Sequence, residues 1–364
     1  MAGLGPADPV DPHFVRRIDP DPDNDSNSYS VTYSVAANEL YLRSFGDDVV
    51  YTYAAASTGG DPWADAVVDA HPTLDGAGLY TDPQSVLGMP TTTFYDPLVS
   101  EQFHVSLVAA PFNLDSPNGQ KVVTTINSGQ FIKVRFDEPV QDDPRNPFGI
   151  DLIVFGNSFF IGNGFPGPTT DMAAHILTGD VFSESVTVAV SPTGLGTPQS
   201  HPDHWYVYTN GPFADALYPS NAYEWDRQLN DWDSQLDFAT PVDPSLAVEE
   251  FAGGSVADGI DLYECSGGGT GFDLAESGFS SISYVYLTGV GGEVDALSDV
   301  FPSLGDFDRD GDVDLRDVAS FQNCFHAGFT GLETCACRSG DFDGNRVVDL
   351  EDYAAVASFF EGPS

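Results

Sequence analysis

The chain has 364 residues, of which 56 are acidic and 12 are basic, and its formal net charge is −44 at pH 7. A charge of this sign and size repels nucleic acids and anionic membrane surfaces, so neither is expected as a partner. Hydrophobic residues make up 41% of the chain, which is enough to bury a core, so the acidity does not indicate disorder. No run approaches the roughly 18 consecutive apolar residues of a membrane span.

The chain up to residue 300 has two parts with different patterns. Residues 1–28 are rich in Pro and Asp and lack apolar periodicity, which predicts an extended N-terminal arm. Residues 29–300 contain short β-branched and aromatic runs separated by Gly, Pro, Asn and Asp, with apolar and polar residues alternating in runs such as 185–190 and 282–287. This pattern predicts a mostly β domain, and we expect a jelly-roll β-sandwich.

Two runs predict how individual strands are buried. In 130–136 the apolar residues Ile132, Val134 and Phe136 alternate with polar ones, so one face of this strand is expected to pack on the core. Run 151–155 is apolar on both faces after its first residue, which predicts a central strand.

A twelve-residue acidic loop begins at Asp306. Oxygen-bearing side chains occupy positions 1, 3, 5, 9 and 12, and glycine occupies position 6, where the chain must turn sharply. Calcium takes about six to eight oxygen ligands in flexible geometry, and this spacing wraps oxygens around one centre. The predicted ligands are Asp306, Asp308, Asp310, Asp314 and Asp317, together with the backbone carbonyl of Asp312.

A second copy of this loop begins at Asp341 and repeats the ligand spacing. Arg346 replaces the glycine at position 6, and a non-glycine residue at positive φ costs about 1 kcal/mol, so weaker calcium affinity is expected here. The predicted ligands are Asp341, Asp343, Asn345, Asp349 and Asp352, together with the backbone carbonyl of Val347.

Each loop leads into an amphipathic segment, at 315–325 and 350–360, and both segments predict helices. The short segments before the loops, 302–305 and 338–340, offer no preceding helix, unlike an ordinary EF-hand. The duplicated loop and helix over about residues 304–361 therefore resembles a type I dockerin. The resemblance implies calcium-dependent folding of a small α-helical module and docking to a cohesin-like partner.

Dockerins usually present the residues that contact the partner at the start and middle of each helix. The resemblance therefore implies that the contact surface includes Val318, Ala319, Tyr353 and Ala354. The cysteine-rich insert between the two loops departs from the dockerin pattern of cellulosomes. An alternative is that the calcium pair only stabilises the end of the chain and has no partner.

The cysteines are expected to form disulfides rather than a zinc site, because the spacing of the last two is tighter than zinc ligation favours. Sequence alone leaves the three possible pairings open. The candidates are Cys265, Cys324, Cys335 and Cys337.

Four segments of the β-domain, 61–68, 76–88, 151–157 and 271–275, resemble bacterial secreted or cell-surface proteins with a discoidin-like, galactose-binding-like jelly roll. The resemblance implies a possible further calcium site at the turn that contains Gly76, Gly78 and Asp82. Asp273 and Asp295, from later segments, would contribute further ligands to this site. The alternative is that these acids cap turns through hydrogen bonds to their own backbone.

The segment 191–245 interrupts the strand rhythm and is long for a loop, and long loops on β-scaffolds tend to carry recognition. Aromatic residues within it could stack on the apolar faces of sugars. The candidate ligand-binding residues are Trp205, Tyr206, Trp225 and Trp232. The alternative is that most of these rings belong to the core.

Standard catalytic motifs are absent from the sequence: there is no Gly-x-Ser-x-Gly, no His-Glu-x-x-His and no phosphate-binding glycine loop. We therefore predict a non-catalytic, secreted or cell-surface calcium-binding protein with a dockerin-like module for assembly or attachment and a β-sandwich that could bind carbohydrate. Two alternatives stay open, an extracellular polysaccharide-degrading hydrolase with a dockerin-like tail and a purely structural surface protein. Residues 1–6 lack the features of a signal peptide, so a secreted location assumes that the signal has been removed.

Overall fold

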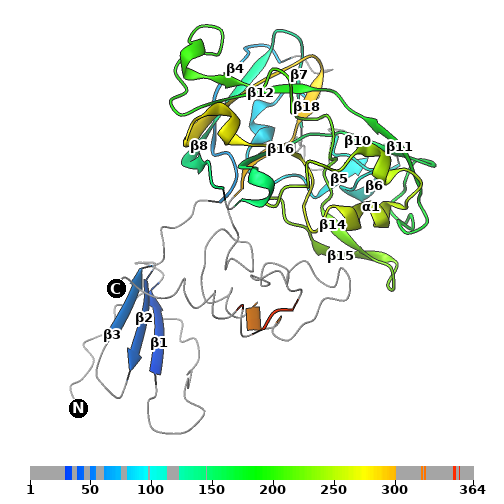
Figure 1. Ribbon diagram of the computed structural model, residues 1–364. Coiled ribbons are helices and arrows are strands. Elements are labelled where there is room, and N and C mark those ends of the chain that lie inside the picture. The colour runs from blue at the N-terminus through cyan, green and yellow to red at the C-terminus, as the bar shows by residue number, and fades with distance from the viewer. Residues whose placement is uncertain are drawn as a thin grey trace. The chain divides into compact units, whose positions relative to one another are not determined.

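The computed structural model of this chain is mostly β, with antiparallel pairing and one α-helix, α1 (Val256–Leu262), in the part that it describes (Figure 1). The described residues are 61–74, 80–96, 99–112, 123–144 and 146–300, the strands at 29–34, 39–44 and 50–54, and residues 321, 322, 324, 347–349 and 352. No helix among them has the length and apolar character needed to cross a membrane.

The chain divides into two compact units. One contains residues 1–59, 303–329 and 336–364, and its described part includes the antiparallel sheet of β1 (Tyr29–Ser34), β2 (Glu39–Ser44) and β3 (Val50–Ala54). The other contains residues 60–302 and 330–335 and is called the β-domain below. The predicted arm, residues 1–28, lies outside the described residues.

A five-stranded antiparallel sheet runs through the β-domain. Its order is β13 (Tyr206–Val207), β12 (Val186–Ser191), β17 (Ser281–Gly289), β8 (Phe131–Gln141) and β4 (Ala66–Ala70). On β8 the side chains of Ile132, Val134 and Phe136 are at most 3% exposed. Their alternation in the sequence correctly predicted a strand with one buried face.

A three-stranded sheet places β9 (Leu152–Phe155) between β16 (Thr270–Phe272) and β19 (Ala296–Asp299). All four β9 residues are 0% exposed, so the prediction of a central strand at 151–155 is confirmed. The two sheets share one apolar core, because β8, β12 and β17 contribute residues to the same cluster as β9, β16 and β19. The connectivity of a jelly roll stays a prediction.

The remaining elements are short. Two-stranded sheets pair β5 (Thr93–Asp96) with β6 (Glu101–His104), β7 (Thr124–Ile126) with β18 (Gly292–Val294), β10 (Phe159–Gly162) with β11 (Leu177–Phe182), and β14 (Tyr223–Asp226) with β15 (Asp231–Gln235). Single 3₁₀ turns occur at η1 (Pro83–Val86), η2 (Pro147–Gly149), η3 (Pro202–His204), η4 (Val248–Phe251) and η5 (Leu274–Ser277). The segment 191–245, expected to be a long loop, thus contains β13 and the β14–β15 hairpin.

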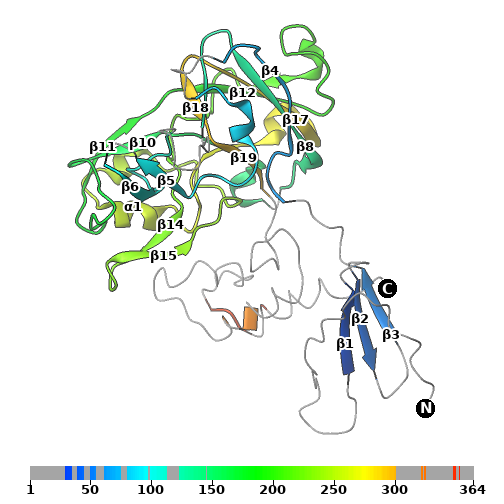
Figure 2. The ribbon, with the colours of Figure 1, turned by 180° about the vertical axis from the view of Figure 1, so that it is seen from behind.

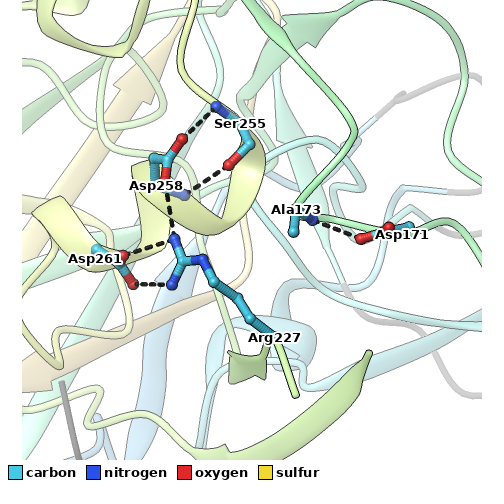
Figure 3. Close-up of polar contacts among 6 residues, drawn as sticks. All are labelled: Asp171, Ala173, Arg227, Ser255, Asp258 and Asp261. Carbon is cyan, nitrogen blue, oxygen red and sulfur yellow. Dashed lines mark hydrogen bonds and ion pairs between the residues drawn. The ribbon is translucent and has the colours of Figure 1, made fainter. Parts of the chain in front are cut away.

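A second core lies on the side of the β-domain that holds α1, β14 and β15, away from β4, β8 and β12 (Figures 1 and 2). The N-terminus of α1 is closed by a capping box, in which Ser255 Oγ accepts the amide of Asp258 and Asp258 Oδ2 accepts the amide of Ser255. Arg227, beyond the end of β14, reaches this helix and pairs with Asp258 and Asp261 (Figure 3).

The two ends of the β-domain meet in space. Trp63 forms a β-bridge with Ser298, the amide of Ala64 donates to the carbonyl of Leu297 at 3.2 Å, and the amide of Asp299 donates to the carbonyl of Pro62 at 2.7 Å. The segments that enter and leave this domain are therefore held side by side.

Candidate functional site

Three carboxylates gather at one end of the three-stranded sheet. Asp142 follows β8, Asp151 immediately precedes β9, and Asp273 immediately follows β16. Since Leu152 pairs with Phe272 in antiparallel register, the residues just beyond this pair are brought together. One oxygen from each carboxylate lies within 4.8 Å of the others, a spacing that could hold a metal ion. These three residues are called the acidic cluster below.

Asp151 is the buried member of the cluster and is 0% exposed. Its Oδ1 accepts hydrogen bonds from the amide of Asp143 at 3.0 Å and from Asn146 Nδ2 at 2.8 Å, and its Oδ2 accepts the amide of Leu274 at 2.9 Å. Burial raises the pKa of Asp151 and the nearby charge of Asp142 raises it further, while the three hydrogen bonds act in the opposite direction. The position of this carboxylate is therefore fixed by the backbone around it.

The other two members are more accessible. Asp142 is exposed and Asp273 is half-buried. Asp273 Oδ1 accepts the amide of Ala275 at 2.7 Å, so this residue also caps η5, as the turn-capping alternative proposed. The ion pairs within the described residues join Arg135 to Asp137 and Arg227 to its two partners on α1, and none of them involves the acidic cluster.

Of the three acids proposed for the β-domain, only Asp273 lies in such a cluster within the described residues. Asp82 caps η1 by accepting the amide of Gln84 at 3.0 Å, and Gly76 and Gly78 lie outside the described residues. Asp295 is buried, and its carboxylate accepts hydrogen bonds from the amide and the hydroxyl of Thr91. The sequence analysis did not select Asp142 and Asp151, although Asp151 directly precedes the apolar run 152–155.

Another buried carboxylate, Asp215, is satisfied by the backbone. Its Oδ1 accepts the amides of Asn157 and Ser158, and its Oδ2 accepts the amide of Glu293. Burial raises its pKa well above the ordinary value. This arrangement ties three segments of the chain together, which is a structural role.

The second C-terminal loop is described at three of its predicted ligands. The amide of Asp349, at position 9, donates to Asp352 Oδ2, at position 12, with a distance of 2.8 Å. Asp352 is helical and 0% exposed, and Val348, four residues earlier, is also 0% exposed. Val347 takes part in a β-bridge. In the segment predicted as the first helix, Phe321 is helical and 2% exposed.

The other predicted calcium ligands lie outside the described residues, and so do the four residues proposed to contact a partner. These ligands are Asp306, Asp308, Asp310, Asp312, Asp314, Asp317, Asp341, Asp343 and Asn345.

The aromatic candidates do not form one surface. Trp205 is 6% exposed, and its Nε1 donates to the carbonyl of Leu195 at 3.0 Å. Trp225 is 9% exposed and belongs to the second core. Tyr206 and Trp232 are half-buried, on separate sheets. Stacking on a sugar is thus restricted to these last two rings, because the other two are covered by the protein.

The described cysteines, Cys265 and Cys324, are each in a disulfide bond. Both side chains are buried. Cys335 and Cys337 lie outside the described residues.

No protein-family model, curated protein or solved structure matches this chain. The resemblances to dockerins and to discoidin-like domains therefore stay predictions.

Proposed function

We propose that this chain is a non-catalytic, secreted or cell-surface calcium-binding protein whose C-terminal loops attach it to a partner. The observation that supports this proposal is the hydrogen bond from the amide of Asp349 to the carboxylate of Asp352. Position 12 of a calcium loop supplies a ligand. A side chain that accepts the amide three residues before it makes one half of a capping box, the contact that begins a helix. The contact between these two positions has the form expected of a calcium loop that ends in a helix.

Burial of the Asp352 carboxylate adds a second argument. A carboxylate that is removed from water is costly unless donors or a cation compensate its charge. The amide of Asp349 supplies part of that compensation, and a calcium ion bound at position 12 would add to it. Val348, in the same loop, is also buried, so calcium binding and folding of this segment are expected to be coupled.

Attachment to a cohesin-like partner is the second step of the proposal. It rests on the resemblance of residues 304–361 to type I dockerins. In this view calcium orders the two helices, and the ordered helices present Val318, Ala319, Tyr353 and Ala354 to the partner.

Calorimetric titration of the full chain with calcium tests the first step. We expect the number of sites to fall when the first loop carries Asp306→Asn and Asp308→Asn, and again when the second carries Asp341→Asn and Asp343→Asn. Each loop variant should also show less helical circular dichroism at saturating calcium.

A charge-matched control is the pair Asp69→Asn and Asp203→Asn, which removes two charges from exposed positions of the β-domain. This control should bind as many calcium ions as the original chain. Loop variants that retain the original number of sites would contradict the proposal.

A carbohydrate-binding role for the β-domain is favoured at one position. The half-buried ring of Trp232 lies 5.5 Å from the half-buried ring of His104. An aromatic ring beside a polar imidazole suits a neutral glycan. Binding of a glycan array by the full chain, lost on Trp232→Ala and retained on Leu229→Ala, would support this role, and a silent array would reject it.

A further inference from the structure

We propose that the acidic cluster of Asp142, Asp151 and Asp273 is a calcium site of the β-domain that joins the β8–β9 loop to the turn after β16. This inference is independent of the two C-terminal loops. It assigns a site to residues of which the sequence analysis selected only Asp273.

The first argument is charge. The three carboxylates bring oxygens within 4.8 Å of one another, and within the described residues no cationic side chain pairs with them. Like charges at this distance repel, most strongly for Asp151, which is shielded from water. A divalent cation between the three would turn this repulsion into attraction.

The second argument comes from Asn146, which lies in the same loop and is 4% exposed. Its Nδ2 donates to Asp151 Oδ1 at 2.8 Å and to the carbonyl of Val300 at 2.9 Å, whereas its Oδ1 is buried without a hydrogen-bond partner. More than about nine in ten buried polar atoms in proteins have a partner. Because Oδ1 shares a carbon with the Nδ2 that contacts Asp151, this unsatisfied oxygen lies beside the cluster, where an ion or its water could bind it.

The third argument concerns the type of ion. The cluster offers only oxygen atoms, which favours calcium or magnesium over zinc or copper. One carboxylate is exposed, one is half-buried and one is buried, so the site opens to solvent on the side of Asp142 and leaves room for water. Calcium tolerates such irregular coordination better than magnesium, which demands near-ideal octahedral geometry.

The position of the site explains what an ion would do there. Asp142 and Asp151 are the two ends of the loop between β8 and β9, and β8 and β9 belong to different sheets. Asp273 begins the η5 turn after β16. An ion shared by the three would fasten this loop at both ends and connect the five-stranded sheet to the three-stranded sheet. We expect a dissociation constant of about 10⁻⁴ to 10⁻³ M, as is typical of extracellular modules.

The test uses the full chain with Asp142→Asn and Asp273→Asn together. Asparagine at 273 keeps an oxygen that can accept the amide of Ala275, so the cap of η5 is retained. Asp151 is left unchanged because its carboxylate holds the loop in place. The expected calorimetric result is the loss of one calcium per chain compared with the Asp69→Asn and Asp203→Asn control.

A second measurement is the melting temperature of the β-domain with and without 5 mM calcium. Calcium should raise it in the original chain and in the control, but not in the cluster variant. A cluster variant that binds as much calcium as the control, or that is stabilised equally by it, would overturn the proposal. The same would follow if magnesium alone stabilised the original chain.

The outcome also separates this site from the loops. A chain carrying all four loop substitutions, at 306, 308, 341 and 343, should retain one calcium site, and adding the two cluster substitutions should remove it. If the loops do not bind calcium, the original chain itself has the single site of the cluster. If the cluster does not bind, the loop variant has none.

Discussion

Thr91 gives both of its hydrogen-bond donors to the carboxylate of Asp295. Its amide lies 2.8 Å from Oδ2, and its hydroxyl lies 2.7 Å from Oδ1. The contact joins segments that are far apart in the sequence, and Asp295 is only 2% exposed. Burial raises the pKa of Asp295 from 3.8 to about 7, although both hydrogen bonds from Thr91 oppose the rise.

This raised pKa predicts that the contribution of Asp295 to stability is lost as the pH rises. Between about pH 4 and pH 7 the folded chain keeps the Asp295 proton that the unfolded chain releases, so the contribution of this residue to the free energy of unfolding falls with pH across this window. Asp295→Asn should reduce the slope of the unfolding free energy against pH by up to about 1.4 kcal/mol per pH unit. Urea unfolding from pH 4.5 to 7.5 measures this slope, and Asp203→Asn, at an exposed position, is the control. Identical slopes in the two variants would contradict the prediction.

The capping box of α1 predicts a modest loss of stability for Ser255→Ala. The variant removes the acceptor for the amide of Asp258, and such caps are worth about 1 kcal/mol. Ser255→Thr should retain most of the stability because it keeps the hydroxyl. Chemical denaturation of both variants provides the comparison, and an alanine variant as stable as the threonine variant would show that the cap contributes nothing.

Gly268 is required by both its conformation and its surroundings. Its φ is +86°, and a Cβ there would overlap the carbonyl oxygen of Pro219. Gly268→Ala should therefore cost about 2 to 4 kcal/mol. Gly88 has a similar φ of +82° but no atom within 4 Å of such a Cβ, so Gly88→Ala should cost only about 1 kcal/mol. The difference between the losses of unfolding free energy in the two variants measures the cost of the steric overlap at Gly268. Equal losses would show that the overlap contributes nothing.

The ion pairs of Arg227 predict a small effect. Its guanidinium contacts Asp258 at 2.9 Å and Asp261 at 2.7 Å, yet its side chain is 40% exposed (Figure 3). Solvent-exposed pairs contribute about 0 to 1 kcal/mol and are screened by salt. Arg227→Ala should thus lower the unfolding free energy by less than about 1 kcal/mol in low salt. The loss should shrink further in 0.5 M NaCl, and a larger loss that salt leaves unchanged would point to packing by the arginine stem.

Local patterns in the sequence predicted individual strands well. Alternation identified the buried face of β8, and continuous apolar character identified β9 as central, because the side-chain period of a strand depends on neighbours in sequence. The hairpin of β14 and β15 was missed. Its strands are short and rich in charged residues, and its turn depends on Asn230 at a φ of 53°, a conformation that asparagine tolerates.

The acidic cluster was predicted only in part. Asp273 was selected, but its partners were not, because their proximity depends on the register of β9 against β16 rather than on any spacing along the chain. With 56 acidic residues in the sequence, proximity cannot be read from their number. The calcium loops are the opposite case. The predicted ligands of each loop lie within twelve consecutive residues, so their spacing along the chain is enough to predict the site.

The meeting of Trp63 with Ser298 has a mechanical consequence. If the chain is pulled at Asp61 and Val300, the load enters and leaves at adjacent points. It acts first on the short pairing of 62–64 with 297–299, and it does not stretch the five-stranded sheet between distant ends. The sheet is therefore expected to stay folded, to one side of the line of force, until this pairing gives way.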